Sequence, residues 1–227
     1  MTPKKAIIFD ASTLISLAMN GLTSELAELK KTFKGKFIIT KEVKYEVIDR
    51  PINIKRFELE ALRVKQLLDK GVFEMPSVFG IKDSEISKIT QELVQIANST
   101  FYNNASDIHL IDLGEASCMA VSKILNEKKI ENVLAIDERT VRMLIEKPEN
   151  LLNLLEKKLH TKLNSRKQNY ETFSGFNILR SSELVYMIYK KGIIKLEDGK
   201  TLDALLYAVK FSGCSISEDE IYEIEKL

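Results

Sequence analysis

Short runs of apolar residues recur along the chain, each too short for a helix. The clearest are residues 6–9, 36–40 and 132–136, and less regular ones lie at 72–78 and 176–179. Unbroken apolar runs of this length are typical of strands that are buried on both faces, as in a parallel sheet. The pattern therefore predicts up to five strands, at least three of them buried.

Between these runs, apolar residues recur every three or four positions, as on the buried face of an amphipathic helix. The predicted helices cover residues 14–29 (with a break near Asn20 and Gly21), 40–48, 54–70, 84–97, 116–124, 141–147 and 182–189, and two short ones lie within 201–227. Strands that alternate with helices predict an α/β fold with a central, mostly parallel sheet flanked by helices, and extra helices at the C-terminus.

Residues 149–172 look like an addition to this alternation, and we expect them to form a helical, basic elaboration. Their leucines repeat every four residues: Leu151, Leu155, Leu159 and Leu163. This repeat favours core packing, with a homodimer contact as the alternative. Because no linker rich in Pro, Gly or Ser divides the chain, we expect one domain over residues 1–190. Residues 191–227 should then be a helical extension packed on it.

Composition narrows the class of protein. Hydrophobic residues make up 44% and charged residues 30%, which is ordinary for a globular protein. The net charge of +1 gives no general attraction to nucleic acid, so such a surface would have to be a local patch. Cys118 and Cys214 lack metal-like spacing, which fits a reducing compartment. We see no signal peptide and no apolar run of about 18 residues, and we expect a cytoplasmic protein without membrane contact.

Four acidic residues stand where such a fold collects functional groups. Asp10 and Asp137 directly follow predicted strands, Glu46 lies on the helix after the second strand, and Glu115 lies at a helix start. Ligands of open α/β sheets bind at the carboxyl ends of the strands. Carboxylates that lie close together repel one another, so a cluster of them indicates a bound cation.

The residue types suggest which cation this would be. Mg²⁺ and Mn²⁺ prefer oxygen ligands, and they activate water and steady the leaving oxygen when a phosphodiester is hydrolysed. Ser12, Thr13 and Asp112 are expected to lie just behind the four acids and to orient them.

Each acid also has a purely structural interpretation. Asp10 and Asp137 can cap the helices that follow them. Asp112 and Glu115 have the spacing of a capping box, and Glu46 can belong to a solvated helix face. The pattern of all four is more informative than any one of them.

In order and context, the four acidic motifs resemble those of the PIN-domain nucleases. The motifs are Phe9-Asp10-Ala11-Ser12, residues 40–47 with Glu46, Leu113-Gly114-Glu115-Ala116 and Ala135-Ile136-Asp137-Glu138-Arg139. The resemblance covers roughly residues 5–147, with a final strand and helix at 176–190. It implies a three-layer α/β/α fold and metal-dependent endonucleolytic cleavage of RNA, with the four acids as catalytic metal ligands.

The chain departs from this family pattern in places. Ser117 stands where many members carry a further acid, so a second metal site would lack that carboxylate. Glu42 shares a helix face with Glu46 and is an alternative second acid. Residues 149–172 and the C-terminal tail are additions to the compact form of the toxin-like members of this family. For toxin-like members, the resemblance implies a small antitoxin-like protein as a partner beside RNA.

Cationic residues suited to RNA phosphates lie mainly in the second half of the chain. They are Arg139, Arg142, Lys157, Lys158, Lys162, Arg166 and Lys167. A run of charges is also typical of a solvated face.

Two other functions compete with the nuclease. One is a PIN-like module that binds RNA or protein without catalysis. The other is a haloacid-dehalogenase-like phosphatase, a family that also opens with an apolar strand ending in Asp. That family carries a second Asp where this chain has Ser12.

Overall fold

A single five-stranded sheet organises the computed structural model, which describes residues 5–104, 106–196 and 198–227. Its strands are β1 (Lys5–Phe9), β2 (Lys36–Ile38), β3 (Phe73–Glu74), β5 (Glu131–Ala135) and β7 (Ile178–Leu179). They lie in the order β3-β2-β1-β5-β7, and every neighbouring pair is parallel. The prediction of an α/β fold around a parallel sheet is confirmed.

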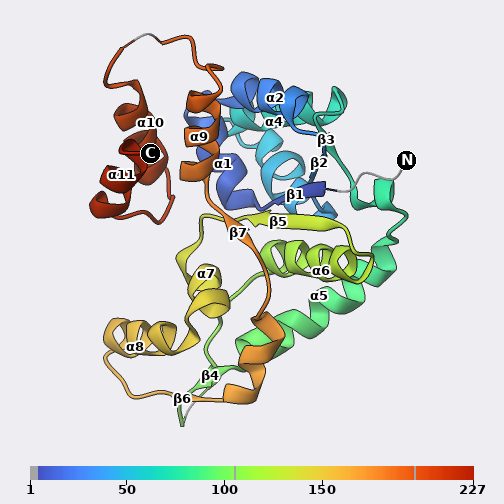
Figure 1. The fold of residues 1–227 in the computed structure, drawn as a ribbon. Helices are drawn as coiled ribbons and strands as arrows, with labels where there is room; N and C mark the ends of the chain where they lie inside the picture. Colours follow the sequence, from blue (N-terminus) through green and yellow to red (C-terminus); the bar gives the residue numbers. More distant parts are fainter. Residues whose placement is uncertain (1–4, 105, 197) are drawn as a thin grey trace.

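Helices cover both faces of the sheet and complete three layers (Figure 1). On one side lie α1 (Ala11–Met19), α2 (Thr23–Thr32), α4 (Glu58–Asp69) and α9 (Ser181–Lys190). On the other side, α6 (Leu113–Glu127) packs against β1 and β5, and α5 (Asp83–Asn98) packs against α6. Because α6 lies between the sheet and α5, most of its residues are buried.

The centre of the sheet explains why the apolar runs form strands. Phe9, Phe37 and Phe73 lie on three neighbouring strands, and the ring of Phe9 is 5.0 Å from that of Phe37 and 5.3 Å from that of Phe73. Strands β1 and β5 pair in register up to Phe9 and Ala135. The backbone N–H of Asp10 then donates to the carbonyl of Ala135 at 3.0 Å. This register brings the residues that follow β1 and β5 together at one edge of the sheet.

The connection after β2 differs from a simple helix. It consists of α3 (Lys41–Lys44), a π-helical turn (Tyr45–Asp49) and a 3₁₀ turn (Pro51–Asn53). The strand expected at 72–78 is only the two residues of β3, and a 3₁₀ turn (Pro76–Phe79) follows it. In the part of the chain that the structure describes, no helix has the length and apolar character needed to cross a membrane.

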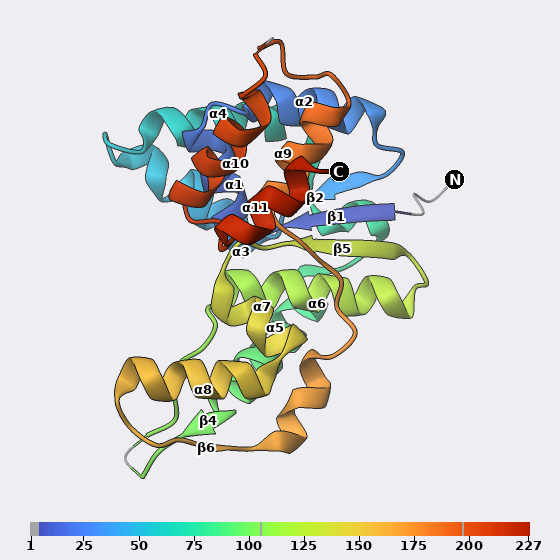
Figure 2. The same cartoon turned by 60° about the vertical axis from the view of Figure 1, so that its left-hand side comes forward.

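The prediction of a helical elaboration at 149–172 is only partly right. Helix α7 (Arg139–Glu146) leads to α8 (Pro148–Leu159), which ends at His160 with φ of 51°. Strand β6 (Asn164–Ser165) follows and pairs antiparallel with β4 (Phe101–Tyr102), and then comes a 3₁₀ segment (Lys167–Phe173). Figure 2 shows α8 and these two short strands beyond the layer of α5 and α6.

The leucine repeat in this segment does not form a continuous buried stripe. Leu151 is fully buried, but Leu159 is 44% exposed. Leu163 is buried, but it lies in the loop between α8 and β6 and not on the helix.

The C-terminal helices α10 (Thr201–Phe211) and α11 (Glu218–Glu225) lie next to α9 (Figure 2). Their buried residues Leu206, Val209 and Ile221 belong to the same hydrophobic cluster as the central strands. In addition, the Asn20 side chain at the end of α1 donates to the carbonyl of Ala208 at 3.3 Å. A boundary near residue 190 stays a prediction.

Candidate active site

Asp10 ends β1 and caps α1. Only 3% of its surface is exposed, and its Oδ2 accepts hydrogen bonds from the Ser12 backbone N–H at 3.1 Å and from the Ser12 hydroxyl at 2.6 Å. The Ser12 Oγ in turn accepts from the backbone N–H of Asp137 at 3.2 Å. Ser12 therefore links the first acid to the loop that carries the fourth, as expected of a residue that orients the acids.

Asp137 follows β5 and is 1% exposed. Its Oδ1 accepts a hydrogen bond at 2.7 Å from the backbone N–H of Ser181, the first residue of α9. Its Oδ2 is buried and, within the described residues, has no hydrogen-bond partner. The alternative that Asp137 caps the next helix is wrong, because Glu138 caps α7 by accepting from the Val141 N–H at 2.8 Å.

Glu46 and Glu115 both lie near the start of α6. Glu46 lies on the π-helical turn and is half-buried, with its carboxylate against Gly114. A Cβ atom at Gly114 would lie 2.7 Å from Glu46 Oε1, so a side chain there would displace the carboxylate. Glu115 accepts from the Asp112 backbone N–H at 2.7 Å, which confirms the capping box.

The surroundings of these carboxylates favour their protonated forms. Burial is the main cause that raises the pKa of Asp10, and the charge of Asp137 adds to it. Burial and the charge of Asp10 raise the pKa of Glu46 to about 7. Burial, with Asp10 as the largest charge contribution, raises the pKa of Glu115 to about 8. Burial also raises the pKa of Asp137 against the hydrogen bond from Ser181. The acids thus act on one another electrostatically.

The four acids would offer only carboxylate oxygens to a ligand, which suits a hard divalent cation. One of these oxygens, Asp137 Oδ2, is buried without a hydrogen-bond partner in the described chain. The side chains are not arranged as a finished coordination shell. Across residues 5–104, 106–196 and 198–227, no three His, Cys, Asp or Glu side chains form a group ready to hold a metal ion. A cation would have to draw the carboxylates inward.

The residues expected behind the acids have mixed roles. Thr13 is buried, and its hydroxyl has no partner among the described atoms. Asp112 is exposed and binds His109 Nε2 at 2.9 Å through its own carboxylate. Ser117, in the place of a further acid, is buried with its Oγ 2.7 Å from the Thr40 hydroxyl, so a carboxylate there would be buried against α3.

The site also bears on the choice between two candidate second acids. Glu46 contacts Gly114 beside Glu115, whereas Glu42 acts on Glu46 only as one of several nearby charges. This arrangement favours Glu46 as the second acid.

The predicted RNA-binding cations do not form one patch. Arg142 donates to the Ser215 carbonyl at 2.7 Å. Arg166 pairs with Asp107 at 2.9 Å and lies over the Tyr102 ring, so it holds the small second sheet together. Lys162 forms a surface ion pair with Glu156. The remaining four are exposed: Arg139 at the start of α7, Lys157 and Lys158 on α8, and Lys167 after β6.

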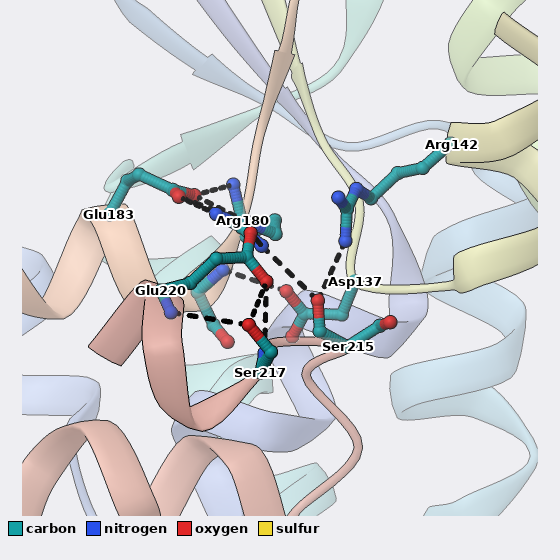
Figure 3. Close-up of polar contacts among 8 residues, drawn as sticks. Asp137, Arg142, Arg180, Glu183, Ser215, Ser217 and Glu220 are labelled. Atoms are coloured by element: carbon teal, nitrogen blue, oxygen red, sulfur yellow. Dashed lines mark hydrogen bonds and ion pairs between the residues drawn. The ribbon is translucent and has the colours of Figure 1, made fainter. Parts of the chain in front are cut away.

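The C-terminal tail reaches the site, a contact that the sequence did not predict. The Ser215 N–H donates to the Asp137 carbonyl at 3.4 Å, and Arg180 donates to the Ser215 carbonyl at 3.2 Å (Figure 3). Arg180 also pairs with Glu183 on its own helix and with Glu220 on α11. For the start of α9, though not for the tail, the sequence held a signal: residues 176–179 were expected to form a strand of the same parallel sheet, and residues after neighbouring parallel strands lie together.

No family model matches the chain, and comparison with curated proteins and with solved structures gives no match either. The resemblance of the four motifs to PIN-domain nucleases therefore stays a prediction. A fold alone does not define an activity, so the site has to carry the functional argument.

Proposed function

We propose that this protein is a metal-dependent endoribonuclease that hydrolyses RNA phosphodiester bonds. The observation that carries the proposal is that two buried carboxylates, Asp10 and Asp137, lie at the carboxyl edge of a parallel sheet, and that burial and the charge of Asp10 raise the pKa of the half-buried Glu46 and Glu115. The Ser12 hydroxyl donates to the Asp10 carboxylate and accepts from the backbone N–H of Asp137. The Glu46 carboxylate lies against Gly114 at the start of α6. Within the described chain, none of the four acids has an ion-pair partner. Burying such a set without a cation is unfavourable.

Asp10, Glu46, Glu115 and Asp137 are the residues that would hold Mg²⁺ or Mn²⁺. When bound, such an ion activates water and stabilises the leaving oxygen of a phosphodiester. The chain's own contribution is to fix the carboxylates. Ser12 holds one Asp10 oxygen, and the start of α9 holds one Asp137 oxygen, so the partnerless Oδ2 of Asp137 is left for a ligand.

RNA as the substrate is supported by the resemblance of the four motifs and by the exposed Arg139 next to the site. The structure offers less support for a phosphatase of the haloacid-dehalogenase type. Where that family has a second Asp, this chain has Ser12, whose hydroxyl already bonds Asp10 and the Asp137 N–H.

One observation favours a second candidate, a PIN-like module that binds RNA or protein without catalysis. The acids of the described chain do not form a ready metal-binding group. In this alternative, the capping hydrogen bonds of Asp10 and Glu115 would be their only role.

The test is incubation of labelled single-stranded RNA with the protein in Mn²⁺, Mg²⁺ or EDTA. The wild type is compared with Asp10→Asn and Asp137→Asn, and with Asp219→Asn as a control because Asp219 is exposed on α11. We expect cleavage that requires metal, is lost in the first two variants and is unchanged in the control. Cleavage that is equal in all four proteins would contradict the assignment.

A further inference from the structure

A mainly apolar pocket of about 350 Å³ lies directly beside the proposed site. It is formed between α1, the π-helical turn, the 3₁₀ turn at 51–53 and α4, and Glu46 is part of its wall. Four large apolar residues that line it are well exposed: Ile15 at 42%, Met19 at 59%, Ile54 at 40% and Phe57 at 42%. Exposed apolar residues grouped around a hollow are typical of ligand-binding surfaces.

Charges at the pocket point to the kind of ligand. Arg50 and Arg56 line it and are exposed, and in the described chain neither has an ion-pair partner. The Arg56 guanidinium lies 5.4 Å from the centre of the Phe57 ring. An aromatic ring with a stacked arginine is a surface on which unpaired bases stack, and free arginines attract phosphates. The acids at this pocket are Glu46 and Glu60.

We propose that this pocket binds one unpaired base of a single-stranded RNA, next to the phosphate that is cleaved. The inference rests on the proposed function, because Glu46 belongs both to the pocket wall and to the carboxylate site. A base stacked on Phe57 would place the adjoining phosphate towards Glu46 and the arginines. The volume suits one base, whereas an amphipathic helix of a protein partner needs a groove that accepts anchors over two turns.

The experiment uses a short single-stranded RNA that contains the fluorescent base 2-aminopurine, titrated with the full chain in EDTA and in Mg²⁺. Stacking on an aromatic ring should quench the fluorescence. We expect Phe57→Ala and Phe57→Leu to weaken binding about tenfold or more, because both remove the ring. Phe57→Leu keeps apolar volume, which protects against loss of folding. Phe211→Ala is the control, since Phe211 is 81% exposed on α10.

Two results would overturn the inference: no quenching by the wild type in either condition, or equal binding by the Phe57 variants and the wild type. Self-association or capture of a helical peptide that depends on Phe57, without RNA binding, would also overturn it. The fluorescence titration measures binding and does not depend on cleavage, so the base pocket and the nuclease can be contradicted independently of each other. Quenching that depends on Phe57, without any cleavage, supports the base pocket and contradicts the nuclease. Cleavage that the Phe57 substitutions do not affect supports the nuclease and contradicts the base pocket.

Discussion

The absence of a side chain at Gly114 is what allows the Glu46 carboxylate to lie against the start of α6. Residues in the first turn of a helix lie close together, and any Cβ at this position would meet the Glu46 carboxylate at 2.7 Å. The φ angle of Gly114 is not in the left-handed region, so close approach is the reason for glycine here. The sequence showed Gly114 as part of a motif, but it did not show which side chain would approach it.

At the residue scale, the raised pKa of Glu115 predicts how stability depends on pH. Its ordinary value of 4.5 applies to the unfolded chain, and folding raises it to about 8. The folded state therefore binds the extra proton. Without metal, the contribution of this group to stability is complete below about pH 4.5 and is lost as the pH rises through about 8.

We therefore expect Glu115→Gln to be more stable than the wild type by about 1–2 kcal/mol at pH 9 in EDTA, after allowance for its partial exposure. The amide can still accept from the Asp112 N–H, so the helix start is preserved. Urea unfolding from pH 4 to 9 measures this, with the exposed Glu223→Gln as control. A difference that does not change with pH would contradict the burial of this acid.

At the scale of elements, the periodicity of the sequence predicted most of the fold. The apolar runs became β1, β2 and β5, and the amphipathic stretches became helices on both faces. At 149–172 the prediction was only partly right, because the leucine at every fourth residue continues past the end of α8. The left-handed backbone of His160 ends that helix, and β6 then pairs with a distant strand. Neither the end of α8 at His160 nor the pairing of β6 produces a periodic pattern of apolar residues in the local sequence.

The π-helical turn that carries Glu46 was not predicted either. Such turns insert one residue into a helical ladder, are frequent at functional sites and have no hydrophobic period of their own. The sequence marked the four acids as candidates, whereas their arrangement in space depends on this turn and on the register of β1 and β5.

Helix α11 offers a prediction at the same scale. Arg180 joins the start of α9 to α11 through Glu220 and to the tail through the Ser215 carbonyl, and its side chain is 13% exposed. Replacing it by Met leaves these acceptors without their cation. We expect Arg180→Met to lose about 2 kcal/mol of stability, less than the roughly 3–5 kcal/mol of a fully buried pair, and to speed amide exchange in α11.

Lys226→Met is the matched control, because the ion pair between Lys226 and Glu223 is exposed and contributes little. Hydrogen exchange followed by mass spectrometry separates the two variants. Unchanged exchange in α11 of Arg180→Met would show that the tail is held by its apolar contacts alone.

At the scale of the whole molecule, parallel pairing of distant segments creates the site. Asp10 follows the first strand and Asp137 the fourth in chain order of the main sheet, yet the pairing of β1 with β5 sets them side by side. Strand β7 adds the start of α9, and the tail contacts Asp137 through the hydrogen bond from the Ser215 N–H to the Asp137 carbonyl. The sequence predicted that Asp10 and Asp137 would meet at this edge of the sheet, and the pairing of β1 with β5 confirms that placement. The sequence could not predict the tail, because that contact depends on how α10 and α11 pack.

Binding of Mn²⁺ to the metal-free protein, measured by calorimetry, tests the central claim most directly because it needs no substrate. The wild type should bind the ion and gain thermal stability. Asp10→Asn should bind on the order of tenfold or more weakly, as should Gly114→Ala, which displaces Glu46. Gly199→Ala should bind like the wild type, since a Cβ there meets nothing within 4 Å. Absence of binding by the wild type, or equal binding by all four proteins, would contradict a carboxylate metal site.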